Sequence, residues 1–441
     1  MRSSYLASTV LVLLSACSSS PSNDAPGGGA TADAGVEGGG SQVCVPGLSD
    51  ERLRLDTATI ASPAVGNSQV SLAVGDGTLG VAYFDASKRV NVELVSSDGT
   101  TRNVRIGGTV SNSISQAYRT AIAYRDGVFG VAFSMERDAT RGADTVWSSV
   151  GFSAVSVEGG TASAVTMANN NLDRSAEPVI AGEPFVATTS TGFLPAWVDR
   201  RTAEPTRLNV NIAGWGGIYG RNFTSTGEAS TARDVQVQQE GLPRTAFKIL
   251  PTRAGLLALW ASSESGADAR ILAKQGPADG NFAVTPASAP RVEPLLTIPR
   301  MGPSNLAGAV GADGNVLLAF SLSKLQGGTS SPLVAVLVGP DGRLISNKPI
   351  QVQASAQMGR LAVAASEGGY KLAYEADAPE GRKIYIADVD AAGMPGAQSS
   401  VAMDGPLADM VLETSPGRTA LHFATGEKGT VALRSFTLCG P

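Results

Sequence analysis

The amino-acid sequence predicts an all-β fold, a seven-bladed β-propeller built from four-stranded antiparallel blades. Three observations predict it: a glycine–aromatic pair recurs along the chain, short alternating strands surround each pair, and each end of the chain carries part of one unit. Repetition at this scale indicates a repeat architecture, and units of about 50 to 60 residues with four strands are typical of propeller blades. The pairs are Gly77 with Tyr83, Gly127 with Phe133, Gly192 with Trp197, Gly255 with Trp260, Gly314 with Phe320, Gly369 with Tyr374 and Gly417 with Phe423.

The N-terminus has the features of an export signal. Arg2 gives a weakly positive start, and the apolar run 5–14 is too short to span a bilayer. The following Leu14-Ser15-Ala16-Cys17 resembles the lipobox of bacterial lipoproteins, whose signal is cut before the cysteine. The resemblance implies a signal peptide over 1–16 and acyl chains on Cys17, each buried methylene contributing about 0.8 kcal/mol to membrane binding. Ser18 after the cysteine favours the outer membrane as the location, with the protein facing either the periplasm or the cell surface. An ordinary secretory signal with an incidental cysteine is the alternative.

Residues 17–43 hold the lipidated cysteine and a tether of Ser, Gly, Pro, Ala and Asp. Such a segment buries too little apolar surface to order itself. No similar linker interrupts residues 44–441, so we expect one domain there, and we expect a monomer. The net charge of −5 and the absence of a basic run argue against nucleic acid as a partner.

The first repeat shows the four strands in order. Apolar residues alternate over 70–74, 79–83 and 90–94, Asp76-Gly77 and Asp98-Gly99 provide turns, and Val104 and Ile106 mark a fourth strand. Residues 207–212 and 383–386 are predicted third strands of later repeats. Pro195 departs from the pattern, because an interior strand loses a donor at proline unless it forms a bulge.

The two ends predict a closed ring. The last repeat has no fourth strand after 431–436, and the alternating segment 52–55 has no repeat before it. Pairing these segments removes an exposed edge. Cys44 and Cys439 flank them, and in an oxidising compartment we expect a disulfide, contributing as much as about 4 to 5 kcal/mol in the chain-entropy model. Metal binding by the two cysteines is the weaker alternative.

The second strands resemble those of the seven-bladed β-propeller lipoproteins of Gram-negative bacteria. The motifs that carry this resemblance are Val81-Ala82-Tyr83, Val131-Ala132-Phe133, Ala196-Trp197-Val198-Asp199, Leu318-Ala319-Phe320 and Leu372-Ala373-Tyr374. The resemblance covers residues 44–441 and implies a rigid scaffold with loops around a central channel, not a reaction.

Catalytic patterns are sparse. The single histidine, His422, rules out chemistry that needs several histidines, and a structural role is expected for it. Sialidase-like propellers use carboxylates, a tyrosine and an arginine cluster, but Ser96-Ser97-Asp98-Gly99-Thr100 does not reproduce their turn motif. Four tryptophans are too few for a quinone-cofactor propeller, and Asp388-Val389-Asp390 with Gly393 lacks the oxygens of a calcium loop. We therefore expect no cofactor and no metal.

The face formed by the loops between second and third strands is the expected ligand surface. Exposed aromatic residues near arginines are typical anchors for protein or sugar ligands. The candidate ligand-binding residues are Arg137, Asp199, Arg200, Arg201, Trp215, Tyr219 and Arg221. In the alternative, Trp215 packs under its own loop and the charges are solvated or paired.

These observations favour a lipid-anchored envelope protein that acts as a non-enzymatic binding or scaffold module for an envelope protein or a glycan. The alternative is a sialidase-like, carboxylate-dependent polysaccharide hydrolase or lyase.

Overall fold

The structure is a computed structural model, and clustering of contacts separates residues 1–39 from a unit Gly40–Pro441. The described residues all belong to this unit. They are 43–44, 54–56, 70–85, 87, 89–109, 119–137, 147–168, 181–199, 217–232, 234–238, 243–263, 268–282, 293–299, 301–324, 332–346, 349–353, 358–403, 405–427 and 430–439. The predicted signal peptide and tether lie outside this set, apart from Val43. None of the described residues forms a helix suited to crossing a membrane.

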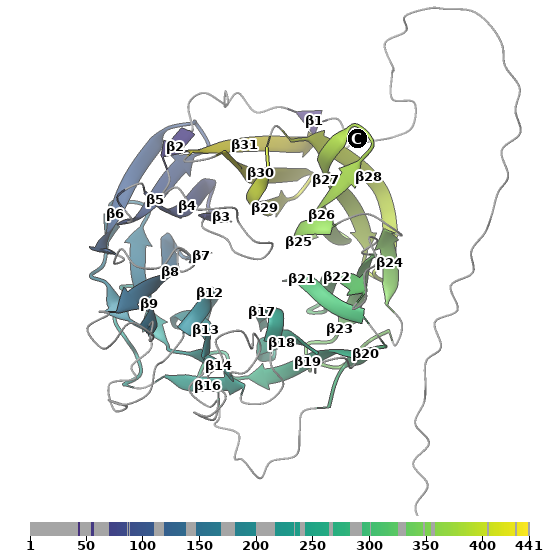
Figure 1. The fold of residues 1–441 in the computed structure, drawn as a ribbon, viewed down its shortest axis with the longest axis horizontal. Helices are drawn as coiled ribbons and strands as arrows, with labels where there is room; N and C mark the ends of the chain where they lie inside the picture. Colours follow the sequence, from purple (N-terminus) through teal and green to yellow (C-terminus); the bar gives the residue numbers. More distant parts are fainter. Residues whose placement is uncertain are drawn as a thin grey trace, which may run out of the picture. The chain divides into compact units, whose positions relative to one another are not determined.

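Seven antiparallel sheets surround a central axis, which confirms the predicted seven-bladed propeller (Figure 1). In each blade the strands follow one another from the innermost, at the axis, to the outermost. Blade 1 is β3 (Val70–Gly75), β4 (Thr78–Phe84), β5 (Arg89–Ser96) and β6 (Thr101–Thr109); blade 2 is β7 (Thr120–Arg125), β8 (Val128–Arg137), β9 (Trp147–Ser156) and β10 (Thr161–Ala162) with β11 (Thr166–Met167). Blade 3 is β12 (Ala181–Thr188), β13 (Gly192–Asp199), β14 (Gly217–Gly220) with β15 (Phe223–Thr224), and β16 (Val235–Gln238); blade 4 is β17 (Pro243–Thr252), β18 (Gly255–Ser263), β19 (Ala269–Gly276) and β20 (Leu296–Ile298).

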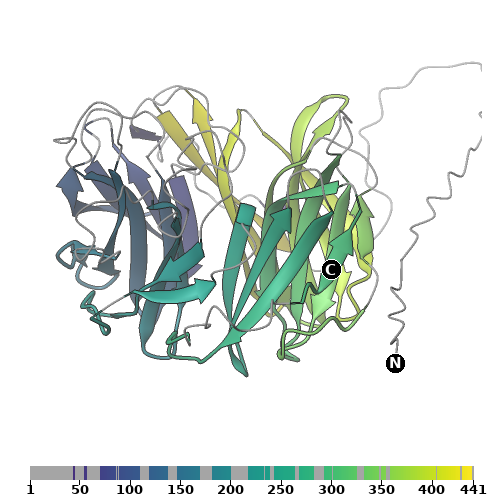
Figure 2. The same cartoon turned by 60° about the horizontal axis from the view of Figure 1, so that its bottom comes forward.

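The remaining three blades complete the ring. Blade 5 is β21 (Met301–Val310), β22 (Val316–Lys324), β23 (Leu333–Val338) and β24 (Ile350–Gln353); blade 6 is β25 (Met358–Ser366), β26 (Gly369–Ala378), β27 (Gly381–Asp390) and β28 (Pro395–Ala402). Blade 7 is β29 (Leu407–Ser415), β30 (Arg418–Glu427) and β31 (Thr430–Cys439), completed by β1 (Val43–Cys44) and β2 (Arg54–Asp56). The strands run between the two faces of the ring (Figure 2). We call the face where the innermost strands begin the mouth face, and the opposite face, where they turn into the second strands, the first-turn face.

The N-terminal strands close the ring, as predicted from the sequence. Leu55 is opposite Val431 in the β2–β31 pair, and Val43 is opposite Leu438 in the β1–β31 pair. Cys44 is opposite Thr437, two residues before Cys439. The side chains of both cysteines lie outside what the structure describes, so the disulfide stays a prediction.

The glycine–aromatic pairs have a clear structural basis. Asp76 and Gly77 have φ values of 47° and 70°, and the equivalent Asp126 and Gly127 have 46° and 77°, as a type I′ hairpin turn requires. The aromatic partner toward the other end of each second strand is buried, with exposures that range from 0% at Trp197 to 6% at Tyr83. The apolar residues pack in seven clusters, each formed by two neighbouring blades, so the core of the protein lies between the sheets.

A second glycine pattern fits neighbouring blades together. A Cβ on Gly130 would lie 2.5 Å from the ring of Phe193 in the next blade, and a Cβ on Gly80 would lie 2.7 Å from the ring of Phe129. Both rings are fully buried. These glycines are therefore sites of close packing between sheets.

Blade 3 differs from the sequence-based prediction. Its third strand is β14, followed by β15, whereas the predicted third strand 207–212 lies outside the described residues. Pro195 lies in β13 opposite Val186, and on its other side the partner strand is interrupted between β14 and β15. The missing donor of the proline is thus accommodated at this interruption, where Arg221 N–H donates to Pro195 O at 3.1 Å.

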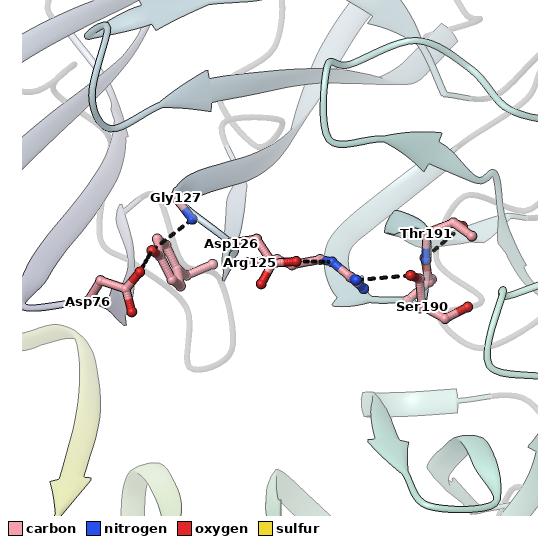
Figure 3. Close-up of polar contacts among 8 residues, drawn as sticks. Asp76, Arg125, Asp126, Gly127, Ser190 and Thr191 are labelled. Atoms are coloured by element: carbon pink, nitrogen blue, oxygen red, sulfur yellow. Dashed lines mark hydrogen bonds and ion pairs between the residues drawn. The ribbon is translucent and has the colours of Figure 1, made fainter.

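Polar contacts join the first turns of adjacent blades (Figure 3). The Tyr124 hydroxyl donates to the Asp76 carboxylate of blade 1 and accepts from Gly127 N–H at 2.8 Å. Arg125 Nη2 donates to Ser190 O of blade 3 at 2.9 Å. These contacts connect three consecutive blades on the first-turn face.

Candidate functional site

A cavity of about 400 Å³ lies at the centre of the ring, lined by residues from or adjoining all seven innermost strands. Each blade contributes to the lining, in blade order through Leu72, Arg119, Phe185, Lys248, Gly308, Arg360 and Asp409. The lining includes the start of β7 and residues beyond the midpoints of β12, β17 and β21, so the cavity occupies the central part of the channel. We call it the channel cavity.

Backbone irregularities shape the lining. Five of the innermost strands, β12, β17, β21, β25 and β29, have a register shift near their start, at 182–185, 243–247, 304–306, 358–361 and 407–409. A β-bulge interrupts the alternation of side chains and re-aims those beside it. Phe185, Arg360 and Asp409, which all line the cavity, lie within or at the end of these shifts.

An arginine–carboxylate pair connects three blades across the cavity wall. Arg360 Nη1 lies 3.7 Å from Asp409 Oδ1, and Leu72 N–H donates to Asp409 Oδ2 at 2.9 Å. Arg360 Nε also donates to Leu407 O at 3.4 Å. Burial raises the pKa of Asp409, and the charge of Arg360 and the Leu72 N–H oppose that rise. The carboxylate is therefore held in place by contacts from the two neighbouring blades.

Lys248 is the second cation of the lining. Its ammonium lies 5.2 Å from the centre of the Phe185 ring, within the range of a cation–π contact. Burial lowers the pKa of Lys248; the Asp409 charge opposes this effect and Arg360 adds to it. Arg119 contributes a third cationic side chain to the lining, and its backbone N–H donates to Ser134 Oγ at 2.8 Å.

The lining therefore has a positive balance. Among the described lining residues, Arg119, Lys248 and Arg360 face one carboxylate, Asp409. The whole chain carries a net charge of −5, so this cavity stands out against an acidic protein. A concave site with one sign of charge and low-dielectric walls concentrates ligands of the opposite sign.

A second cavity, of about 520 Å³, lies between blades 6 and 7 on the first-turn face. Three of its charged side chains are engaged in local contacts: Lys371 pairs with Asp388, and the Asp390 carboxylate accepts from Ala392 N–H at 2.9 Å and Met394 N–H at 2.8 Å. No group of three or more His, Cys, Asp or Glu suited to a metal ion occurs among the described residues. We therefore take the channel cavity as the candidate functional site.

Several residues of the predicted ligand surface cannot be placed in a site. Arg137 and Asp199 are the last residues of β8 and β13, toward the mouth face, where they pair with Trp147 and Gly217 through the backbone. Their side chains are not described, and Arg200, Arg201 and Trp215 lie outside the described residues altogether.

Tyr219 and Arg221 make contacts within and between blades, and their assignment as ligand contacts stays a prediction. Residues 217–220 form a strand rather than a loop, and the strand buries Tyr219 to 6% exposure, with its hydroxyl accepting from Gln236 Nε2 at 3.1 Å. Arg221 donates to Met167 O and Thr231 O, both at 2.9 Å. The arginine therefore joins blades 2 and 3.

His422 has the structural setting expected for it. Its Nδ1 lies 2.7 Å from Ser435 Oγ and its Nε2 lies 3.5 Å from Glu413 Oε2, on the two strands beside β30. The histidine lowers the pKa of Glu413 through this contact, against the effect of burial. Neither the histidine nor its partners line either cavity.

Comparison with known proteins identifies a fold but no family. No protein-family model matches the sequence, and no curated protein matches it. Among solved structures, a polysaccharide lyase, an ulvan lyase bound to a GlcA(1-4)Rha3S saccharide, is similar with a TM-score of 0.56 and 10% identity, covering 87% of this chain and 96% of that chain. An ulvan lyase structure described without the saccharide gives a TM-score of 0.51 at the same identity and coverage. At this identity the likeness concerns the fold alone.

Proposed function

We propose that this protein binds an acidic polysaccharide and takes a carboxylate- or sulfate-bearing sugar unit into the channel cavity. The observation that carries the proposal is the convergence of Arg119, Lys248 and Arg360 on one cavity with a single opposing carboxylate among the described lining residues. Arginine suits carboxylate and sulfate groups because its guanidinium presents several donors in one plane. The volume of about 400 Å³ falls within the range of small-ligand sites.

The apolar part of the lining supports a sugar as the ligand. Phe185 and Phe247 line the same cavity as the cations, and their rings are 5.6 Å apart. Aromatic rings provide flat apolar surface beside polar groups, as a sugar ring with a charged substituent requires. The shared fold with a lyase bound to a saccharide that contains GlcA is consistent with this ligand class.

Cleavage of the bound polysaccharide by β-elimination is the second candidate, favoured by the setting of Lys248. Burial lowers its pKa, which suits a general base. In this reaction the amine takes the proton on the carbon next to the sugar carboxylate, the C–H electron pair forms a C=C bond, and the glycosidic C–O bond breaks. The leaving oxygen takes a proton from water, and the lysine ammonium returns its proton to water. Arg119 or Arg360 would neutralise the sugar carboxylate. Hydrolysis by two carboxylates is less supported, because the described lining has one.

The cellular setting forms part of the proposal. We propose that Cys17 carries acyl chains and anchors the protein to the outer membrane, where polysaccharide is available as a ligand. A Cys44–Cys439 disulfide would secure the edge of blade 7. Its formation requires a local adjustment, because Cys44 is opposite Thr437 and bonded cysteines have Cα atoms about 4.4 to 6.8 Å apart.

Matched polymers test the binding. We expect the protein to bind dextran sulfate but not dextran, or polygalacturonate but not its methyl ester, in titration calorimetry. Arg360→Gln and Lys248→Gln should each weaken binding about tenfold or more, since charge-assisted contacts contribute about 1.5 to 3 kcal/mol. Arg343→Gln, which changes an exposed arginine in a turn of blade 5, is the control. Equal binding of charged and neutral polymers would refute the proposal.

The lyase candidate has its own measurement. β-Elimination creates an unsaturated uronate whose conjugated double bond absorbs in the ultraviolet. Growth of this absorbance with polygalacturonate, and its loss in Lys248→Gln, would support cleavage. Tight binding without any new absorbance, tested on several polyuronates, would leave the protein as a binding module.

A further inference from the structure

We propose that Glu375 is the positioning residue that fixes Arg360 for contact with the anionic sugar unit, an inference that rests on the proposed function. The feature that carries it is the bulge at the start of β25. Met358 is opposite Ala376 and Leu361 is opposite Tyr374, so Gly359 and Arg360 together face Glu375. Two residues on one strand thus oppose one residue on its neighbour.

The Glu375 side chain completes this bulge. A bulge leaves a backbone N–H without its usual ladder partner, and a buried N–H needs one. Arg360 N–H donates to Glu375 Oε2 at 3.1 Å, so the carboxylate replaces the missing strand carbonyl. The Glu375 side chain is 4% exposed, and a charge-assisted contact at such a buried position is stronger than a neutral one.

Gly359 and Arg382 hold the carboxylate from two sides. A Cβ on Gly359 would lie 1.8 Å from Glu375 Oε2, so only glycine leaves room for the carboxylate there. On the other side Arg382 Nη1 donates to Glu375 Oε1 at 2.8 Å. Both oxygens of Glu375 are therefore engaged, and the backbone of Arg360 cannot shift without breaking one of these contacts.

The position of the Arg360 backbone decides where its guanidinium lies. From this position Nη1 lies 3.7 Å from Asp409 Oδ1 and the side chain lines the channel cavity. A regular strand over 358–361 would return the side chains to strict alternation and change the direction of Arg360. Glu375 thus acts on the ligand through Arg360, without lining the cavity itself.

Two substitutions, one on each strand, test the contact between the Glu375 carboxylate and the Arg360 N–H. Glu375→Ala removes the acceptor, and Gly359→Ala displaces it. We expect each variant to bind dextran sulfate about tenfold more weakly than the wild type. The matched control is Asp377→Asn: Asp377 accepts from Arg382 Nε at 2.8 Å, on the exposed side of the same arginine, and touches neither the bulge nor the cavity. Its binding should be unchanged.

A double-mutant cycle separates positioning from a general loss of structure. In an Arg360→Gln background, Glu375→Ala should cause no further loss of binding, because its effect passes through Arg360. With Arg360 present, the Glu375→Gln variant should keep most of the affinity that Glu375→Ala loses, since an amide oxygen can still accept from Arg360 N–H. Hydrogen exchange at Arg360 should be faster in Glu375→Ala, and this readout does not depend on any ligand.

The outcomes distinguish this inference from the proposed function. If the wild type binds no charged polymer, the proposed function fails while exchange at Arg360 still reports on the bulge. If the wild type binds and a folded Glu375→Ala variant binds equally well, the inference is wrong. The inference is also wrong if Glu375→Ala and Arg360→Gln reduce binding additively in the double mutant. Should Glu375→Ala not fold, Gly359→Ala and Glu375→Gln carry the same comparison.

Discussion

Replacing Lys248 by methionine should stabilise the protein and weaken ligand binding. Methionine keeps the length and most of the volume of the lysine side chain but has no charge. Burial lowers the pKa of Lys248, which means that the folded protein holds the protonated lysine less favourably than the unfolded chain does. The charge is therefore retained at a cost in stability.

The size of the gain follows from two opposing contributions. Removing the ammonium relieves its desolvation and its repulsion from Arg360, but it also removes its attraction to Asp409. Lys248 is half-buried, and removing an unfavourably placed charge commonly stabilises a protein by about 0.5 to 2 kcal/mol. Because Asp409 keeps Arg360 and the Leu72 N–H as partners, we expect a gain of about 1 to 2 kcal/mol.

Urea denaturation at neutral pH, followed by tryptophan fluorescence, measures this gain. The stability of the wild type should rise as pH increases through the lowered pKa of Lys248, and Lys248→Met should lack this rise. The same preparations should show weaker binding of dextran sulfate. A variant that is less stable than the wild type would refute the argument, because the lysine would then be favourably paired in the folded protein.

Three other predictions concern packing, pH and the single histidine. Gly130→Ala should destabilise the protein by about 1 to 3 kcal/mol in urea titrations, because the new Cβ would lie 2.5 Å from buried Phe193, whereas Gly426→Ala meets nothing within 4 Å and should be nearly neutral. Dextran sulfate binding, measured by titration calorimetry, should weaken as pH rises, because the channel aspartate, whose pKa burial raises, gains negative charge and the channel lysine, whose pKa burial lowers, loses its proton. His422→Ala should lower the free energy of unfolding by about 1 to 3 kcal/mol. The wild type should lose stability as pH falls below 4.5, the ordinary pKa of Glu413, because His422 lowers the pKa of Glu413 in the folded protein; His422→Ala should lose less stability over this range. Equal acid sensitivity of the two proteins would contradict this last expectation.

The blades could be predicted from the sequence because their signals are local. Asp76-Gly77 specifies a hairpin turn within two residues, and the aromatic residue toward the far end of each second strand marks burial. Ring closure is also predictable, since 431–436 lacks a fourth strand and 52–55 has no partner of its own. The third strand of blade 3 could not be predicted, because the alternating sequence over 207–212 resembles a strand as closely as the sequence over 217–220 does.

The channel cavity could not be predicted in the same way. Its lining depends on bulges in five separate strands, and a bulge such as that at Gly359 and Arg360 depends on a carboxylate from the neighbouring strand. One signal is nevertheless present in the sequence. Lys248 interrupts the otherwise apolar segment 247–250, and a charged residue in the innermost strand of a propeller faces the axis or another blade. The burial of Tyr219 is harder to predict, because the glycine-rich sequence around it does not indicate the strand that buries it.

The pairing of β1 with the end of β31 decides how the ring can be handled in an experiment. The first and third strands of a blade run in the same direction, so β31 ends on the first-turn face, and β1 lies beside that end. An affinity tag or a biosensor linkage placed after β31 would therefore hold the molecule by the first-turn face and leave the mouth face turned toward the solution.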